Sequence, residues 1–400
     1  MLTSLGFIFL LGLLLGGIFK RLKMPSLIGM LITGVLLGPH VWNVLDGSIL
    51  SISANLRELA LVIILTRAGL SLELDDLKKI GRPAVLMSFV PACFEMSGTL
   101  ILGHFLMGLP WLDAALLAAV VASASPAVIV PRMLHLMDTG YGTDKRIPQL
   151  VLAGDSVDDI FNIVVFTSLL GLSGGMASVS VAQFAMIPVS ILTGIAAGLL
   201  LGYLLSLFFG KVHMRDSVKV VVILGIAFLL VAGEDAVREL VPFSGLLSVM
   251  AAGVMLLKKR PVVAERLSRK FSKLWVGAEI LLFVLVGASV NIEYVSAAGL
   301  RTLLLLGVVF LVRGVGTLLC LLRTNLNRKE RLFCVFTGMP KATVQAAIGG
   351  IPLAMGLPNG ELILAVAVLS ILVTAPLGAF ILDVSYKRLL AKAEPRSVRE

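Results

Sequence analysis

The sequence predicts an all-α, multi-pass membrane protein of about thirteen transmembrane helices. Hydrophobic residues make up 58% of the 400 residues and charged residues only 14%, which leaves too little polar surface to cover soluble domains. The apolar residues form long runs rather than the two-residue alternation of a transmembrane β-barrel. The three cysteines lie within apolar runs and the four histidines are scattered, so neither a disulfide framework nor a metal site is indicated.

The expected helices are apolar stretches that can cross about 30 Å of hydrocarbon at about 1.5 Å per residue. They lie at residues 3–19, 25–39, 57–73, 83–108, 111–136, 148–172, 180–209, 217–233, 241–257, 275–290, 299–322, 331–357 and 361–385. The second and the tenth are short enough to be tilted or re-entrant, which leaves the count open by about one. Basic residues follow the first helix rather than precede it, so a cleaved signal peptide is not expected.

Basic residues mark one side of the membrane. Of the 34 Lys and Arg residues, 26 fall in alternate connections or after the last helix, within 20–23, 78–82, 145–146, 211–215, 258–273, 323–331 and 387–399. The opposite connections hold only Arg57, Arg238 and Arg301, so the positive-inside rule places the N-terminus outside and the C-terminus in the cytoplasm. This excess accounts for the net charge of +10 without a nucleic-acid partner. We interpret Lys258 to Lys273 as a topology-setting loop that can also bind anionic lipid head groups.

Ionisable side chains deep within the apolar runs are the candidate functional residues, because moving a charge from water into hydrocarbon is costly. Five lie near the expected bilayer midplane: Glu95, Asp158, Asp159, Arg313 and Lys341. A buried ion pair between Glu95 and Arg313 would lower the cost of each charge. A pairing of Arg313 with Asp158, which leaves Glu95 protonated, is the alternative.

Asp158 and Asp159 are adjacent in the sixth expected helix, and their side chains point about 100° apart. Two neighbouring carboxylates in a poorly hydrated site resist ionising together, so such a pair can hold either a proton or a small cation. That exclusive choice is the chemistry of ion exchange. Asp155 lies one turn towards the cytoplasm on the face of Asp159, where it is a candidate entry funnel for cations.

Two expected helices are interrupted near the same depth. The fifth contains Ser123-Ala124-Ser125-Pro126, and the twelfth contains Gly338-Met339-Pro340-Lys341-Ala342-Thr343. Proline removes a backbone donor, and unwound backbone inside a membrane is tolerated only where it is enclosed by protein or hydrated. Broken helices at equivalent depth therefore indicate a binding site, where Ser125 or Thr343 can supply oxygen ligands and Lys341 can neutralise the facing helix ends.

The interruptions and the buried charges also repeat along the chain. Helices 4–6 match helices 11–13 at an offset of an odd number of helices, which reverses their orientation in the membrane. Glu95 in helix 4 then corresponds to Arg313 in helix 11, and the interruption of helix 5 corresponds to the interruption of helix 12. The sequence therefore predicts an inverted repeat of helices 1–6 and 8–13. Only the first half carries an acidic pair, so one ion site per chain is expected.

Four blocks, in order, resemble the monovalent cation/proton antiporters that carry an Asp-Asp pair, nearest the Na+/Li+/H+ exchangers known in animals as NHA. The blocks are LTRAGL at 65–70, SPAVIVP at 125–131, SVDD at 156–159 and PKATVQAA at 340–347. The resemblance extends from about Leu56 to Thr374, which is most of the chain.

The resemblance implies the Na+/H+ antiporter fold and a homodimer in the cell (inner) membrane. It also implies a core that moves in an elevator fashion, with Asp159 as the principal ion-binding residue and Asp158 as its partner. The implied division is into dimerisation segments at 1–82 and 217–298, an ion-transporting core at 83–172 and 299–385, a linker helix at 173–216 and a tail at 386–400.

Two departures from the family pattern bear on the stoichiometry. Arg313 stands where the best-known electrogenic bacterial members carry Lys, and Ser123 and Ser125 stand where many members carry an Asp. Arg stays protonated at any relevant pH and cannot release a proton as a lysine can. Arg313 together with Glu95 resembles the arrangement of the NHA exchangers, and this resemblance implies electroneutral exchange.

The expected activity is the exchange of Na+ or Li+ for H+ by a transporter that is not an enzyme and needs no cofactor. K+/H+ exchange and Na+-coupled solute symport are alternatives on the same architecture, separable by ion preference and by solute dependence. An intramembrane aspartyl protease also uses two membrane aspartates, but it needs a Tyr-Asp pair on a second helix. The sequence contains no Tyr-Asp, which disfavours the protease.

Overall fold

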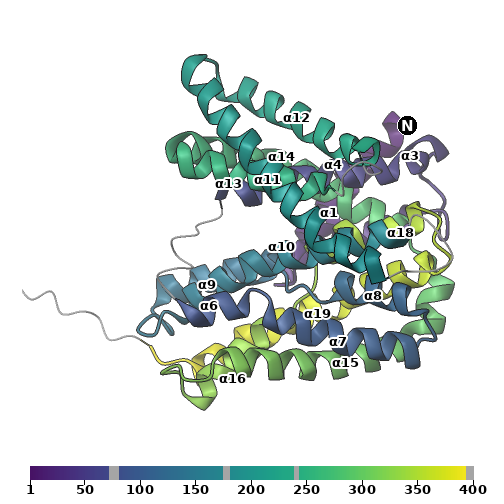
Figure 1. The fold of residues 1–400 in the computed structure, drawn as a ribbon. Coiled ribbons are helices and arrows are strands. Elements are labelled where there is room, and N and C mark those ends of the chain that lie inside the picture. Colours follow the sequence, from purple (N-terminus) through teal and green to yellow (C-terminus); the bar gives the residue numbers. More distant parts are fainter. Residues whose placement is uncertain (72–80, 174–180, 238–242, 393–400) are drawn as a thin grey trace, which may run out of the picture. The chain divides into compact units, whose positions relative to one another are not determined.

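The computed structural model describes residues 1–71, 81–173, 181–237 and 243–392, and its regular elements in these ranges are α-helices (Figure 1). They are α1 Leu2–Arg21, α2 Ser26–Leu37, α3 Gly47–Ser51, α4 Ser53–Ser71, α6 Arg82–Met87, α7 Val90–Phe105, α8 Trp111–Val121, α9 Pro126–Thr139, α10 Ile147–Ser173, α11 Val181–Lys211, α12 Asp216–Val237, α13 Gly245–Lys259, α14 Pro261–Ala288, α15 Ile292–Cys320, α16 Arg328–Thr337, α17 Thr343–Ile348, α18 Ile351–Ala354 and α19 Gly360–Leu389. Some residues of the expected charge pattern and tail lie outside the described residues: Lys78, Lys79, Arg238 and residues 393–400.

The chain folds into two compact units. Unit 1 contains the described residues of Met1–Leu14, Met30–Leu72 and Val164–Ser289. Unit 2 contains those of Leu15–Gly29, Glu73–Ile163 and Val290–Glu400. Helices α1, α2 and α10 contribute to both units, because a boundary between the units falls within each of them.

In unit 1, α4 packs against α13 and α14, and α11 packs along α13. The contact of α11 with α13 includes a hydrogen bond from the Ser248 hydroxyl to Gly194 O at 2.8 Å. Residues Leu282 to Ala288 at the end of α14 are all buried. This run is apolar on every side, as is typical of a helical segment that is buried all round.

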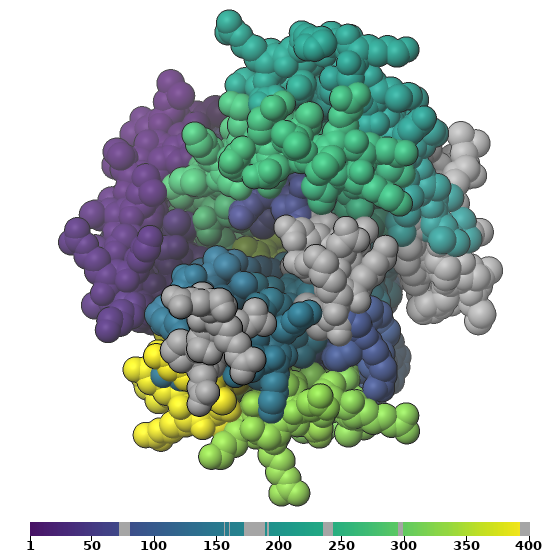
Figure 2. Space-filling view, turned by 90° about the vertical axis from the view of Figure 1, so that its left-hand side faces the viewer, coloured from purple at the N-terminus to yellow at the C-terminus, as the bar shows by residue number. Residues whose placement is uncertain are grey.

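Unit 2 contains both expected interruptions. α7 packs against α15 and α8, and α19 contacts α15, α16 and α8. On the face that Figure 2 shows, blue segments from the first half of the sequence adjoin light-green and yellow segments from the second half. Lys145, in the turn before α10, pairs with Glu330 at 2.8 Å, and Gly142 N donates to Ala391 O at 2.8 Å. Segments from both halves of the sequence thus build this unit.

Within the described residues, each expected membrane stretch coincides with a helix or with an interrupted helix, and eight helical stretches are long and apolar enough to cross a membrane. α2 is short, at 12 residues, as expected. The hydropathy pattern does not predict α3, which begins where the side chain of Asp46 accepts a hydrogen bond from Ser48 N at 2.8 Å. The total number of crossings and their orientation stay predictions.

The prediction of a loop at Lys258–Lys273, followed by a short tenth helix, is wrong. α13 runs to Lys259 and α14 begins at Pro261, so most of the basic run is helical. The segment is amphipathic, because its buried residues recur at three- or four-residue spacing: Ala264, Leu267, Phe271 and Trp275. The charged face lowers the average hydropathy of this segment. A prediction from hydropathy averaged over a window therefore places the start of the helix too late in the sequence.

Candidate functional site

Both expected interruptions are present in unit 2. α8 ends at Val121 and α9 begins at Pro126, while α16 ends at Thr337 and α17 begins at Thr343. Ser125 is extended, at φ −100° and ψ 112°, because the ring of a following proline disfavours the helical conformation. Pro126 then occupies the first turn of α9, where its missing N–H leaves no helical hydrogen bond unmade.

The two unwound segments bond to each other. Ser125 N donates to Pro340 O at 2.9 Å. The side-chain amide of Gln345 donates to Ser123 O at 2.9 Å, and its oxygen accepts from Ala342 N at 2.8 Å. Backbone groups without partners are costly away from water. Each interruption therefore relies on the other for part of its hydrogen bonding.

Two glycines leave room for this crossing. A Cβ on Gly338 would lie 2.6 Å from Arg313 Nε, and a Cβ on Gly378 would lie 2.6 Å from Cγ of Pro340. Carbon atoms do not approach this closely in packed interiors. A larger residue at either position would displace the arginine or the unwound segment.

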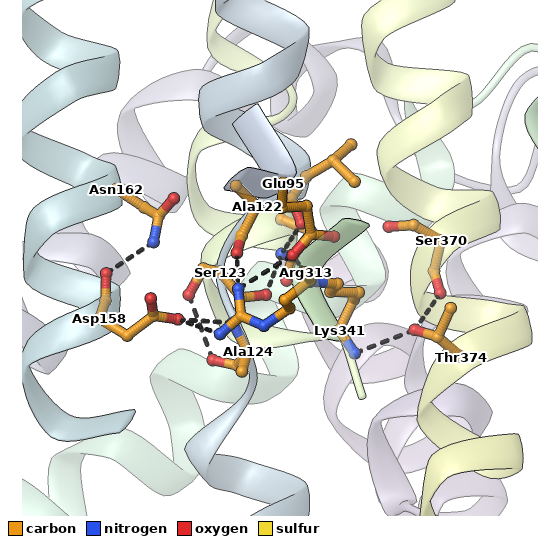
Figure 3. A network of polar contacts seen from close by, with 12 residues as sticks. Glu95, Ala122, Ser123, Ala124, Asp158, Asn162, Arg313, Lys341, Ser370 and Thr374 are labelled. Atoms are coloured by element: carbon orange, nitrogen blue, oxygen red, sulfur yellow. Dashed lines mark hydrogen bonds and ion pairs between the residues drawn. The ribbon is translucent and has the colours of Figure 1, made fainter. Parts of the chain in front are cut away.

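Four buried charged residues lie beside the crossing, and we call them the central charge network: Glu95 of α7, Asp158 of α10, Arg313 of α15 and Lys341 of the second interruption (Figure 3). Arg313 donates from Nη1 to Glu95 Oε2 at 2.9 Å and from Nη2 to Asp158 Oδ2 at 3.0 Å. Lys341 Nζ donates to the same Glu95 oxygen at 2.7 Å. Each of the four side chains is at most 4% exposed. Both pairings of Arg313 that the sequence left open are therefore present, and the ionised network carries no net charge.

Arg313 also reaches the end of α8. Its Nη1 donates to Ala122 O, which directly follows the last residue of that helix. The carboxyl end of a helix carries a partial negative charge. Arg313 thus neutralises this helix end as well as two carboxylates, whereas Lys341 makes its ion pair with Glu95.

The two adjacent aspartates have different surroundings. Asp158 is fully buried; its Oδ2 also accepts from Ala124 N at 3.0 Å, and its Oδ1 has no hydrogen-bond partner among the described residues. Asp159 is partly exposed and accepts a hydrogen bond from the Ser123 hydroxyl. The difference follows from the rotation of about 100° between consecutive helical residues. Asp158 is held by the central charge network, and Asp159 is held by a hydroxyl of the first interruption.

One further polar residue lies one helical turn to each side of the pair. Asp155 is 6% exposed, and its Oδ2 lacks a partner in the described part of the chain. Asn162 is fully buried and donates from Nδ2 to Asp158 O at 2.7 Å. Asn162 is not among the site residues predicted from the sequence. Its signal is a polar amide within an apolar run, at helical spacing from the aspartates.

Ser125 and Thr343, the expected oxygen ligands, face each other with their hydroxyl oxygens 3.4 Å apart. The hydroxyl that contacts the aspartate pair is that of Ser123, two residues earlier in the same interruption. Thr374, whose hydroxyl accepts a hydrogen bond from Lys341 N at 3.0 Å, is also not among the predicted site residues (Figure 3). A threonine in a long apolar helix gives no local signal of such a contact.

Paired charges beside two interrupted helices, in a multi-pass helical protein, define the architecture of a secondary transporter. The family model described as "Sodium/hydrogen exchanger, transmembrane" matches residues 7–384. The chain is 34% identical to sodium/hydrogen exchanger 9B2 of Mus musculus over 400 residues, which cover 94% of this chain and 70% of that relative. It is 30% identical to sodium/hydrogen exchanger 9B1 of Homo sapiens over 394 residues, covering 92% and 73%. The chain belongs to the sodium/hydrogen exchanger family, among the monovalent cation/proton antiporters, and it is a transporter rather than an enzyme.

A solved structure shows the same fold. The sodium proton antiporter MjNhaP1 from Methanocaldococcus jannaschii superposes with a TM-score of 0.84 over 97% of this chain and 98% of that chain, at 21% identity. This superposition confirms the expected antiporter fold, and the family model and the relatives confirm the resemblance to the monovalent cation/proton antiporters.

Proposed function

We propose that the chain exchanges Na+ or Li+ for H+ and that the exchange occurs at Asp158 and Asp159. The observation that carries this proposal is the contrast between the two carboxylates. Asp158 is fixed by Arg313 and Ala124 N, whereas Asp159 is partly exposed and bonded to a hydroxyl. A carboxylate that is reachable and not ion-paired can bind a cation or a proton, and it cannot hold both at once.

The cycle follows from this exclusion. A cation from the cytoplasm displaces the proton from Asp159, while Asp158, Ser125 and Thr343 supply further oxygens. The Ser123 hydroxyl can rotate to present a lone pair in place of its hydrogen, so it can serve both states. Asp155 draws cations towards the site. A proton from the outside then displaces the cation, and the inward proton gradient drives Na+ out.

The proposed exchange is electroneutral. Arg313 keeps its proton at any relevant pH. Lys341 is bonded to Glu95 Oε2 at 2.7 Å, within the charge network and away from the partly exposed Asp159. The aspartate pair is then the group that changes its occupancy, and one Na+ leaves for each H+ that enters.

We also propose the membrane arrangement that the family resemblance implies. Residues 83–172 and 299–385 form an ion-transporting core that moves in an elevator fashion. Residues 1–82 and 217–298 form the dimerisation domain of a homodimer, and 173–216 link the halves of the inverted repeat. The support is that every residue of the charge network lies in unit 2. The N-terminus is outside, the C-terminus is in the cytoplasm, and the protein resides in the cell membrane with anionic lipid at Lys258–Lys273.

The test is exchange by the purified protein in proteoliposomes, with Na+, Li+ or K+ as the cation and the membrane potential clamped. We expect Na+ and Li+ to support proton movement at a rate that the clamped potential does not change. Asp159→Asn should abolish exchange, and Asp138→Asn, at an exposed position on α9, is the matched control. A wild-type rate in Asp159→Asn contradicts the proposed site. Exchange with K+ alone, or transport that needs an organic solute, supports the alternative functions instead.

A further inference from the structure

Helix α10 presents a set of buried oxygen atoms that lack donors. Asp155 Oδ2, Asp158 Oδ1 and Asn162 Oδ1 have no hydrogen-bond partner among the residues that the structure describes. Asp158 and Asn162 are fully buried. Buried acceptors are almost always paired with a donor, a water or an ion. Three of them within eight residues of one helix therefore indicate a ligand that meets this face.

The positions of these residues on the helix bring Asn162 to the aspartate pair. At about 100° per residue, Asn162 projects in a direction between those of Asp158 and Asp159, about 40° from the former and about 60° from the latter. Helical side chains lean towards the N-terminus of their helix, so Asn162 leans back over the pair. Figure 3 shows Asn162 and Asp158 on the side of α10 that faces the first interruption.

A hydrogen bond defines which end of the Asn162 amide is free. Nδ2 lies 2.7 Å from Asp158 O, a backbone carbonyl oxygen that can only accept. The nitrogen must therefore occupy that position, and the oxygen must occupy the other. The hydrogen bond to the backbone of α10 thus occupies the nitrogen of the Asn162 amide and leaves its oxygen as an acceptor without a donor among the described residues.

We propose that Asn162 Oδ1 coordinates the transported cation together with Asp158 Oδ1. This inference rests on the proposed function and adds a neutral ligand from outside the aspartate pair and the two interruptions. Small hard cations prefer oxygen ligands, and a cation at this position satisfies two buried acceptors at once. A neutral amide adds coordination without adding a third negative charge beside Asp158 and Asp159, so a single proton can still neutralise Asp159.

The first measurement is the apparent KM for Na+ in the proteoliposome assay. Removing one oxygen ligand should raise the KM of Asn162→Ala about tenfold, with the maximal rate at saturating Na+ within about twofold of wild type. Asn162→Gln, which keeps a neutral amide oxygen on the same face of α10, should return the KM to within about threefold of wild type. Ser168→Ala is the matched control, because Ser168 bonds back to Val164 O on the same helix at 2.8 Å, as Asn162 does to Asp158 O.

The second measurement is the rise in Tm that Na+ causes in the detergent-purified protein, which reports binding without transport. Asn162→Ala should lose most of this rise, and Asn162→Gln and Ser168→Ala should keep it. If Asn162→Ala lowers the Tm but leaves both the KM and the Na+-dependent rise unchanged, Asn162 is structural and the inference is overturned. Absence of Na+ exchange by the wild-type protein would instead overturn the proposed function.

Discussion

The central charge network and the ion pair between Arg132 and Asp383 lie in the same unit, yet they differ in what holds them together. In the network, one arginine serves two carboxylates, one carboxylate serves two bases, and no side chain is more than 4% exposed. Arg132 and Asp383 form a two-point contact, 2.9 Å at each point, with exposures of 20% and 50%. Water can replace a lost partner in the second case but not in the first. Removal of one member therefore leaves an uncompensated charge only in the network.

The largest expected effect comes from removing the residue that joins the network. Arg313→Met leaves Glu95 and Asp158 without their shared partner and should destabilise the fold by about 3–5 kcal/mol, with loss of exchange. Denaturant unfolding in detergent measures the first effect, and proteoliposome assays measure the second. Arg313→Lys keeps the charge but cannot form the same fork, so its stability should fall between those of wild type and Arg313→Met. A stability for Arg313→Met equal to that of wild type would show that the network is hydrated.

A smaller effect is expected for the link between Lys341 and Glu95. Lys341→Met and Glu95→Gln should each destabilise the protein, and the double variant should lose less stability than the two single variants together. The coupling free energy should be about 1–3 kcal/mol, as for other contacting pairs. A double-mutant cycle from unfolding measurements gives this value directly. Simple additivity would mean that the two side chains do not interact in the folded protein.

A third effect sharpens the contrast between fixed and exchangeable charges. Protons compete with Na+ at the aspartate pair. Lowering the pH therefore leaves a smaller fraction of the protein with an unprotonated site and raises the apparent KM for Na+. The rise should approach about tenfold per pH unit where the pair is mostly protonated. Proteoliposome exchange over a series of pH values measures it. A KM independent of pH would mean that protons and Na+ use separate sites.

The smallest effect is expected at the exposed pair. Arg132→Met should change the free energy of unfolding by no more than about 1 kcal/mol, because water solvates Asp383 once its partner is gone. Unfolding under the conditions used for Arg313→Met gives the comparison, and the pH dependence of the KM should be that of wild type. A loss as large as that of Arg313→Met would remove the distinction between buried and exposed pairs.

The helices and their interruptions could be predicted from the sequence because each has a strong local cause. Long apolar runs indicate helices in a membrane, and Pro126 and Pro340 disfavour helical conformation in the residues before them. The buried charges were predictable because ionisable residues are conspicuous in runs that are otherwise apolar. The basic segment of α14 was not, because window hydropathy averages over the two faces of an amphipathic helix.

The contacts inside the site depend on geometry that no helical period describes. In the unwound segment 122–125, side-chain directions are set by individual backbone angles, so spacing does not tell Ser123 from Ser125. The structure places the Ser123 hydroxyl at Asp159 and the Ser125 hydroxyl towards Thr343. Likewise, the sequence shows that Arg313 must find partners, but only the folded chain shows that it reaches Glu95, Asp158 and Ala122 O together.

The mutual bonding of the two interruptions has a consequence for biosynthesis. Ser123 and its partner Gln345 are 222 residues apart in the sequence. A ribosome delivers the first interruption to the membrane long before the second exists, so carbonyl and amide groups of 122–125 must wait for their final partners. A chain truncated before Pro340 would retain those polar groups unmatched within its apolar surroundings. We therefore expect such nascent chains to be open to quality-control proteases until the twelfth expected helix has been inserted.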